Sequence, residues 1–178
     1  VEYLDREKNA VLFFGIKERA PIGLLGKLNS AGVEVHLYGR GMTRDWLNGI
    51  FGKNHKGVKV FGEYDPKKMG FLNNYKVLIL YPNDNKLNYK YSMPNKLFQA
   101  IDHGLCVVVS DYFEEILQTF QKATGCIYDA NDKNIQNVVL EALENWTDES
   151  CNQARIIKSE IYSDSKEKYI ECLNASRV

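Results

Sequence analysis

The stretch that decides the fold is residues 91–111, which read YSMPNKLFQAIDHGLCVVVSD. Pro94 suits the first turn of a helix, where its missing N–H costs nothing, and apolar residues follow at helical spacing. Gly104 is the expected helix stop, and the valine-rich run after it is apolar on both faces, as in a strand covered by helices on both sides. Because a helix N-terminus offers free N–H groups, the start of this helix favours an anion such as a diphosphate.

These residues resemble the donor-binding signature of GT-B-fold glycosyltransferases. In that signature a small or polar residue, Pro, Asn or Ser, Lys and Leu open a helix, which ends at a glycine and runs into a Val-rich strand closed by Ser-Asp. The resemblance spans roughly residues 9–145, of which only residues 91–111 are specific. It implies that the helix faces the diphosphate of a nucleotide sugar and that Lys96 neutralises phosphate charge. It also implies that Gln99 replaces the acidic residue that holds the ribose hydroxyls.

One departure from the family pattern leaves the stereochemistry open. Many retaining members place two glutamates eight positions apart, and the corresponding positions here hold Tyr91 and Gln99. The resemblance therefore does not decide between retention and inversion of the anomeric configuration. It also leaves the donor sugar, the base and the acceptor open.

Length and composition bound the function further. The 178 residues are enough for one sizeable core, and Lys plus Arg equals Asp plus Glu at 23 each, so no overall charge points to nucleic acid or an anionic membrane. No apolar run approaches the roughly 18 residues that span a bilayer. Four separated cysteines without CxxC spacing argue against a zinc site or a disulfide framework and fit a reducing cytoplasm; they are Cys106, Cys126, Cys151 and Cys172.

Six short apolar runs alternate with helical patterns, which predicts βαβ units and a mostly parallel sheet. The expected strands are residues 10–14, 33–38, 58–61, 76–81, 105–109 and 126–128. The expected helices are residues 22–31, 45–51, 66–74, 94–103, 113–123 and 132–146, the last capped by Asp132. We predict an α/β, Rossmann-like fold with strand order 3-2-1-4-5-6 and helices on both faces. Residues 1–148 would form the nucleotide-sugar-binding domain, and residues 149–178 a helical tail that packs on it.

Ligands of an open parallel sheet sit beyond the C-terminal ends of its strands, which selects candidate residues in three loops. Lys17 and Arg19 follow the first expected strand, and Arg40 follows the second. These cations are candidates for the diphosphate, with a solvated surface position as the alternative. Glu63 and Tyr64 follow the third strand, where a flat apolar surface and a polar edge suit a nucleotide base.

The turn after the polar segment 83–91 and the helix that follows supply the remaining candidates. Ser92 and Met93 precede the helix and face the same expected pocket as Lys96, while Asn95 lies in its first turn. Gln99, one turn further on, has an amide that suits ribose hydroxyls, with an exposed helix position as the alternative. Lys96 is the expected catalytic residue, because a cation there would stabilise charge that develops on a leaving diphosphate.

The sequence thus favours the C-terminal, donor-binding domain of a hexosyltransferase-like glycosyltransferase of polysaccharide biosynthesis. Because the chain opens with Val1 and shows features of only one of the two GT-B domains, we expect it to be a piece of a longer protein and inactive without its N-terminal acceptor-binding domain. We expect no metal, no cofactor besides the donor and no nucleic-acid partner. We expect a location in the cytoplasm or at its membrane face, with any peripheral attachment through the missing domain. The alternatives are a non-catalytic nucleotide- or protein-binding module and half of a nucleotide-sugar epimerase.

Overall fold

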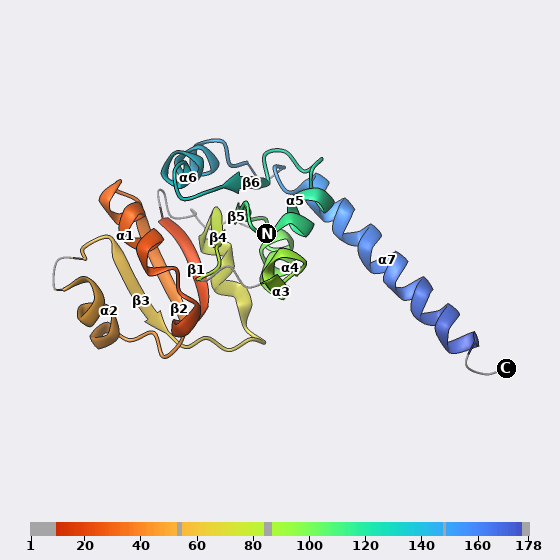
Figure 1. Cartoon of the computed structure of the whole chain (residues 1–178), viewed down its shortest axis with the longest axis horizontal. Coiled ribbons are helices and arrows are strands. Elements are labelled where there is room, and N and C mark those ends of the chain that lie inside the picture. Colours follow the sequence, from red (N-terminus) through yellow and green to blue (C-terminus); the bar gives the residue numbers. More distant parts are fainter. Residues whose placement is uncertain (1–9, 53–54, 84–86, 148, 176–178) are drawn as a thin grey trace.

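The computed structural model describes residues 10–52, 55–83, 87–147 and 149–175. Its centre is one parallel six-stranded sheet in the order β3-β2-β1-β4-β5-β6, so the predicted α/β, Rossmann-like topology is confirmed (Figure 1). The strands are β1 (Ala10–Ile16), β2 (Glu34–Arg40), β3 (Val58–Gly62), β4 (Val77–Leu80), β5 (Cys106–Ser110) and β6 (Ile127–Ala130). Every residue of β4 and β5 is buried, as expected for strands in the middle of a covered parallel sheet.

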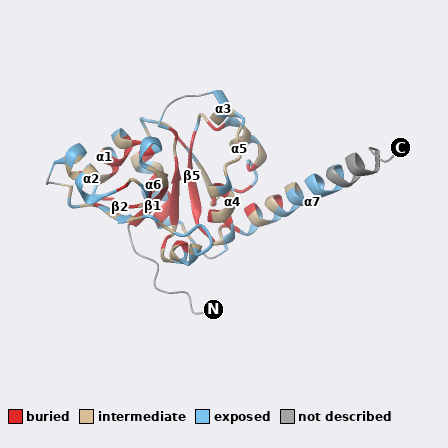
Figure 2. Cartoon of the chain, turned by 90° about the horizontal axis from the view of Figure 1, so that it is seen from below, coloured by how far each residue is buried: buried red, intermediate tan, exposed pale blue. Residues whose placement is uncertain are grey.

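Helices cover both faces of the sheet (Figure 2). One face carries α1 (Ile22–Ser30), α2 (Arg44–Phe51) and α6 (Ile135–Glu144), and the other carries α4 (Asn95–Asp102) and α5 (Glu114–Thr119). The shorter elements are η1 (Lys17–Arg19), η2 (Met69–Asn74) and α3 (Leu87–Lys90). The C-terminal ends of all six strands meet at one edge, because the strands are parallel. That edge carries the loops from which a ligand site is built.

Two helices start several residues later than the sequence predicts. Residues 66–74 contain only the 3₁₀ helix η2, because the carboxylate of Asp65 accepts the backbone N–H of Lys67 at 2.9 Å and holds a local turn instead. Asp132 does not cap the last predicted helix, since α6 begins at Ile135 with Asn134 at the N-cap position. The Asp132 carboxylate accepts a hydrogen bond from the hydroxyl of Tyr81 at 2.6 Å, which draws this loop toward the end of β4.

Three of the four thiols lie in the core. Cys106, Cys126 and Cys151 are fully buried, and the Sγ atom of Cys126 donates to that of Cys151 at 2.9 Å. Hydrogen bonds with Cys106 and Cys151, together with burial, raise the pKa of Cys126. Such thiols behave as small apolar side chains.

The tail is a single helix, α7 (Asn152–Ala175), whose first turns pack on α4 and which then projects from the body (Figure 1). Arg155 donates from Nε to the carbonyl of Ile101 at 3.3 Å, and the Tyr162 and Phe98 rings lie 5.7 Å apart. The domain division at residue 148 stays a prediction, and residue 148 itself lies outside the described part. Of the helices described, none combines the length and apolar character needed to cross a membrane.

Candidate functional site

The candidate site is built around the start of α4, which lies beside the C-terminal ends of β1 and β4. Pro94 is the N-cap residue and has an extended backbone, so the helix begins at Asn95, one residue later than predicted. No side chain caps this N-terminus. Lys96, in the first turn, extends back over the end of β1, where it contributes to two adjoining pockets.

The ammonium group of Lys96 occupies a partly apolar position. Its Nζ atom lies 5.2 Å from the ring centroid of Phe13 and 5.4 Å from that of Phe14, within the range of cation–π contacts. A Cβ atom added to Gly15 would lie 2.6 Å from the same Nζ atom, so a side chain at Gly15 would push the ammonium group out of this position. The glycine at the end of β1 therefore makes room for Lys96.

The Lys96 ammonium has no counter-ion among the residues that the structure describes. Burial, together with the nearby positive charge of Arg19, lowers the pKa of Lys96 to about 8. Among the residues that the structure describes, no carboxylate forms an ion pair with it. A desolvated charge without a partner is unfavourable, so pairing with an anion would stabilise the Lys96 ammonium strongly.

The larger of the two pockets has a volume of about 480 Å³, within the range of small-molecule sites. It brings together five residues that the sequence singled out, namely Lys96, Arg19, Arg40, Glu63 and Tyr64. They come from α4, from the last residue of β2 and from the segments that follow β1 and β3, and Gly15, Ile16 and Pro66 complete the lining. With three cationic side chains against one carboxylate, the pocket favours an anionic ligand.

Tyr64 supplies an aromatic wall of this pocket. Its ring meets that of Phe14 edge to face, with centroids 5.5 Å apart, and lies 5.6 Å from Phe71. Burial raises the pKa of Tyr64, so its hydroxyl stays protonated at neutral pH and is able to donate. A half-buried tyrosine fixed by two other rings offers the flat surface that a planar group needs.

The smaller pocket has a volume of about 260 Å³ and shares Arg19 and Lys96 with the larger one. Ser92 and Pro94 form part of its lining, in front of α4. The Ser92 hydroxyl donates to the carbonyl oxygen of Tyr89 at 3.2 Å, which fixes its orientation. The two pockets thus meet at the two cations, with polar hydroxyl and amide groups on the α3 side.

The other predicted residues lie outside both pockets. The side chain of Lys17 lies against Gly41, where an added Cβ would be 2.9 Å from its Cδ atom. Met93 packs against the core, Asn95 is exposed and Gln99 is half-buried. The predicted segment 83–91 contains α3, and its residues 84–86 lie outside the described residues.

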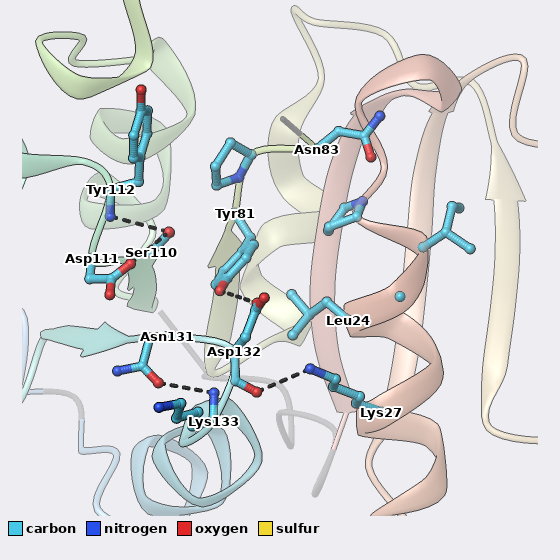
Figure 3. A pocket seen from close by; sticks show the side chains of 14 residues that line it. Leu24, Lys27, Tyr81, Asn83, Ser110, Asp111, Tyr112, Asn131, Asp132 and Lys133 are labelled. Atoms are coloured by element: carbon cyan, nitrogen blue, oxygen red, sulfur yellow. Dashed lines mark hydrogen bonds between the residues drawn. The ribbon is translucent and has the colours of Figure 1, made fainter. Parts of the chain in front are cut away.

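A third and larger cleft, of about 700 Å³, lies at the same edge between α1 and α6 and was not predicted from the sequence. Its polar lining includes Lys27, Asp111, Asn131 and Lys133, together with Asp132, for which the sequence suggested only a helix cap (Figure 3). The rule that ligands lie at strand ends would have indicated this region if it had been applied to β5 and β6. Within the described residues, no group of three or more His, Cys, Asp or Glu side chains is placed to hold a metal ion.

Comparisons with solved structures identify the class of fold. TarM matches with a TM-score of 0.71 at 15% identity over 96% of this chain and 37% of its own. An S. aureus TarM variant crystallised with fondaparinux, alpha-GlcNAc-glycerol and UDP matches at 0.64 and 15%, over 96% of this chain and 36% of its own. AviGT4, a glycosyltransferase of avilamycin A biosynthesis, matches at 0.64 and 13%, over 94% of this chain and 52% of its own.

A fourth match has a different extent. The catalytic domain of cholesterol-alpha-glucosyltransferase from Helicobacter pylori matches with a TM-score of 0.57 at 12% identity, over 86% of this chain and 98% of its own. No protein-family model and no curated protein matches the sequence.

The chain therefore has the fold of a Rossmann-like domain of GT-B glycosyltransferases, which confirms the resemblance at the level of the fold. It spans roughly a third to a half of the length of TarM and AviGT4.

Proposed function

We propose that this chain is the donor-binding domain of a glycosyltransferase that transfers a sugar from a nucleoside-diphosphate sugar to a glycan or lipid-linked acceptor. The observation that carries the proposal is the part-buried ammonium of Lys96, which has no counter-ion among the described residues and lies beside Arg19 at the ends of the strands. A fixed, unneutralised positive charge at this edge of a parallel sheet suits a diphosphate.

In this proposal the diphosphate lies where the two pockets meet. Lys96 and Arg19 line both pockets, so one anion can contact both side chains. Arg40 lies on the larger side and would take a second phosphate oxygen. The nucleoside would extend toward Tyr64 and Glu63, with the base against the tyrosine ring and the carboxylate accepting from a hydroxyl or an amino group.

The chemical role of these residues is electrostatic. Breaking the bond between the anomeric carbon and the phosphate leaves a nucleoside diphosphate with increasing negative charge. Lys96 would stabilise that charge most strongly in the transition state, because its ammonium is already desolvated and positioned. The acceptor, and any general base, would come from another domain of the full-length protein, so the chain alone would bind the donor and transfer little.

Calorimetric titration with UDP tests the proposal, with GDP as a second nucleotide and sulfate as a plain anion. UDP is chosen because an S. aureus TarM variant was crystallised with it. Lys96→Ala should weaken UDP binding by about 1.5–3 kcal/mol, the scale of a charge-assisted hydrogen bond. Lys122→Ala, which removes an exposed lysine after α5, is the matched control and should bind like the parent.

Two results would contradict the proposal. One is equal affinity of Lys96→Ala and the parent for both nucleotides. The other is equal binding of sulfate and nucleotide, which would reduce the pocket to a general anion site.

A further inference from the structure

The 700 Å³ cleft between α1 and α6 has the form of a second ligand site. It lies beyond the C-terminal ends of β4, β5 and β6, and the first turn of α1 closes its far side (Figure 3). Its volume falls within the range of small-molecule pockets and exceeds that of the pocket at Lys96. None of the residues assigned to the nucleotide lines it.

The polar groups of the cleft are held in place by hydrogen bonds. Tyr81 donates from its hydroxyl to the carboxylate of Asp132 at 2.6 Å, and Lys27 donates from Nζ to the backbone carbonyl of Asp132 at 3.1 Å (Figure 3). The Asn131 side chain accepts the backbone N–H of Lys133 at 2.9 Å. The loop between β6 and α6 is therefore tied to both walls of the cleft, which fixes its carboxylate and amide before a ligand arrives.

Some of these groups keep hydrogen-bonding capacity for a ligand. Asp111 is exposed, and its carboxylate has only a long contact with the Ser110 hydroxyl, at 3.5 Å, among the described residues. Asp132 accepts from Tyr81 through one carboxylate oxygen, and an ionised carboxylate has room for further donors. Hydroxyl groups are the donors that such acceptors suit best in a neutral ligand.

Charge and apolar lining narrow the ligand class. The two carboxylates, Asp111 and Asp132, are balanced by the ammonium groups of Lys27 and Lys133, so the cleft has no excess positive charge for a diphosphate. Leu24 and Pro82 give the lining an apolar component against which the C–H face of a sugar ring can lie. Balanced charge, fixed acceptors and apolar walls suit a neutral compound with many hydroxyl groups.

We propose that this cleft binds a neutral saccharide segment. Tyr81, Pro82 and Asn83 line both the cleft and the 260 Å³ pocket that reaches Lys96, so the two regions adjoin. A saccharide in the cleft would thus lie next to the donor pocket. That the saccharide belongs to the acceptor chain rests on the proposed function.

Amide chemical shifts of the full chain test the proposal, with maltotriose and triacetylchitotriose as neutral probes, each titrated with and without saturating UDP. We expect at least one probe to shift the amides of Asp111 and Asp132 in the presence of UDP as well as in its absence. Asp111→Ala should weaken that probe by about tenfold, the scale of a lost hydrogen bond to a charged group. Asp164→Asn, an exposed carboxylate change on α7, is the control and should leave the affinity unchanged.

The outcomes separate the two sites. Saccharide binding without UDP binding would support the cleft and count against the donor pocket, while UDP binding without a response to either trisaccharide would overturn the cleft alone. Displacement of the trisaccharide by UDP would also overturn it, since the saccharide would then occupy the donor's own site. A folded Asp111→Ala variant that binds like the parent would contradict the role of the carboxylate.

Discussion

The pocket at the start of α4 and the cleft between α1 and α6 lie at the same edge of one sheet, yet they differ in how their charges are paired. The α4 pocket holds Lys96, Arg19 and Arg40 against a single carboxylate, and Lys96 has no counter-ion among the described residues. The cleft holds equal numbers of ammonium and carboxylate groups. The sheet supplies the place for a ligand in both regions, and the charge pairing selects its chemistry.

The difference is invisible in the overall composition. The chain has a formal net charge of zero, which by itself excludes nothing about a local anion site. Burial makes the difference, because a desolvated and unpaired ammonium gains far more from a phosphate than an exposed lysine does. Changes confined to the α4 pocket should therefore alter nucleotide binding and leave the cleft between α1 and α6 unaffected.

The largest effect among these should come from Gly15→Ala. The added methyl group would fall within 2.6 Å of the present position of Lys96 Nζ, and the flexible lysine would move away. We expect UDP binding to weaken by about tenfold, since a displaced ammonium loses most of a charge-assisted hydrogen bond. Gly49→Ala, with no atom near the added group, is the matched control and should leave UDP affinity unchanged. Calorimetry measures both, and parent-like binding by Gly15→Ala would show that the position of Lys96 is irrelevant.

A smaller effect should follow from pH. Because the pKa of Lys96 is about 8, its protonated fraction, and with it UDP affinity, should fall by about fourfold from about pH 7 to about pH 8.5. Lys96→Ala should lack this dependence over the same interval. The trisaccharide affinity of the cleft should also stay constant, which separates the two regions. A parent affinity for UDP that is flat across this interval would count against Lys96 as the group that pairs with phosphate.

The smallest effect concerns stability. Lys96→Met should stabilise the unliganded chain by about 1 kcal/mol at pH 7, because an unpaired, part-buried charge is removed. The folded-state pKa of Lys96 is lowered from 10.5 to about 8, so the folded chain binds fewer protons than the unfolded chain in that interval. The parent therefore gains stability as pH rises from 8 toward 10.5, and the advantage of Lys96→Met should shrink there. Urea unfolding at about pH 7 and near pH 10.5 tests this, and a Lys96→Met variant less stable than the parent at pH 7 would contradict it.

The sheet was predictable because each strand is a short, dense apolar run whose pattern needs no tertiary information. All six strands and their order were predicted, since right-handed crossovers leave few topologies for alternating strands and helices. Helix starts were less predictable. Asp65 and Asp132 both have the chemistry of an N-cap, but one holds a local turn and the other bonds to Tyr81, which lies far from it in the sequence.

The site divides in the same way. Strand-end position and side-chain type predicted Arg19, Arg40, Glu63 and Tyr64, and the start of the helix predicted Lys96. The structure gathers these five residues in one pocket, and their contact with a ligand stays a prediction. Lys17 has the same chemistry but lies against Gly41, a contact that depends on the approach of two loops. The cleft between α1 and α6 was not predicted, because its lining comes from several separate segments that come together only in the folded chain.

The most direct test of the division between the two regions is the map of amide chemical-shift changes that UDP produces in the full chain. We predict the largest changes at Gly15, Tyr64 and Lys96, with the amides of Asp111 and Asp132 unaffected. Loss of those changes in Lys96→Ala would place the nucleotide at the unpaired ammonium. The opposite pattern, with the largest changes at Asp111 and Asp132 and none at Lys96, would contradict the assignment of the cationic pocket to the donor.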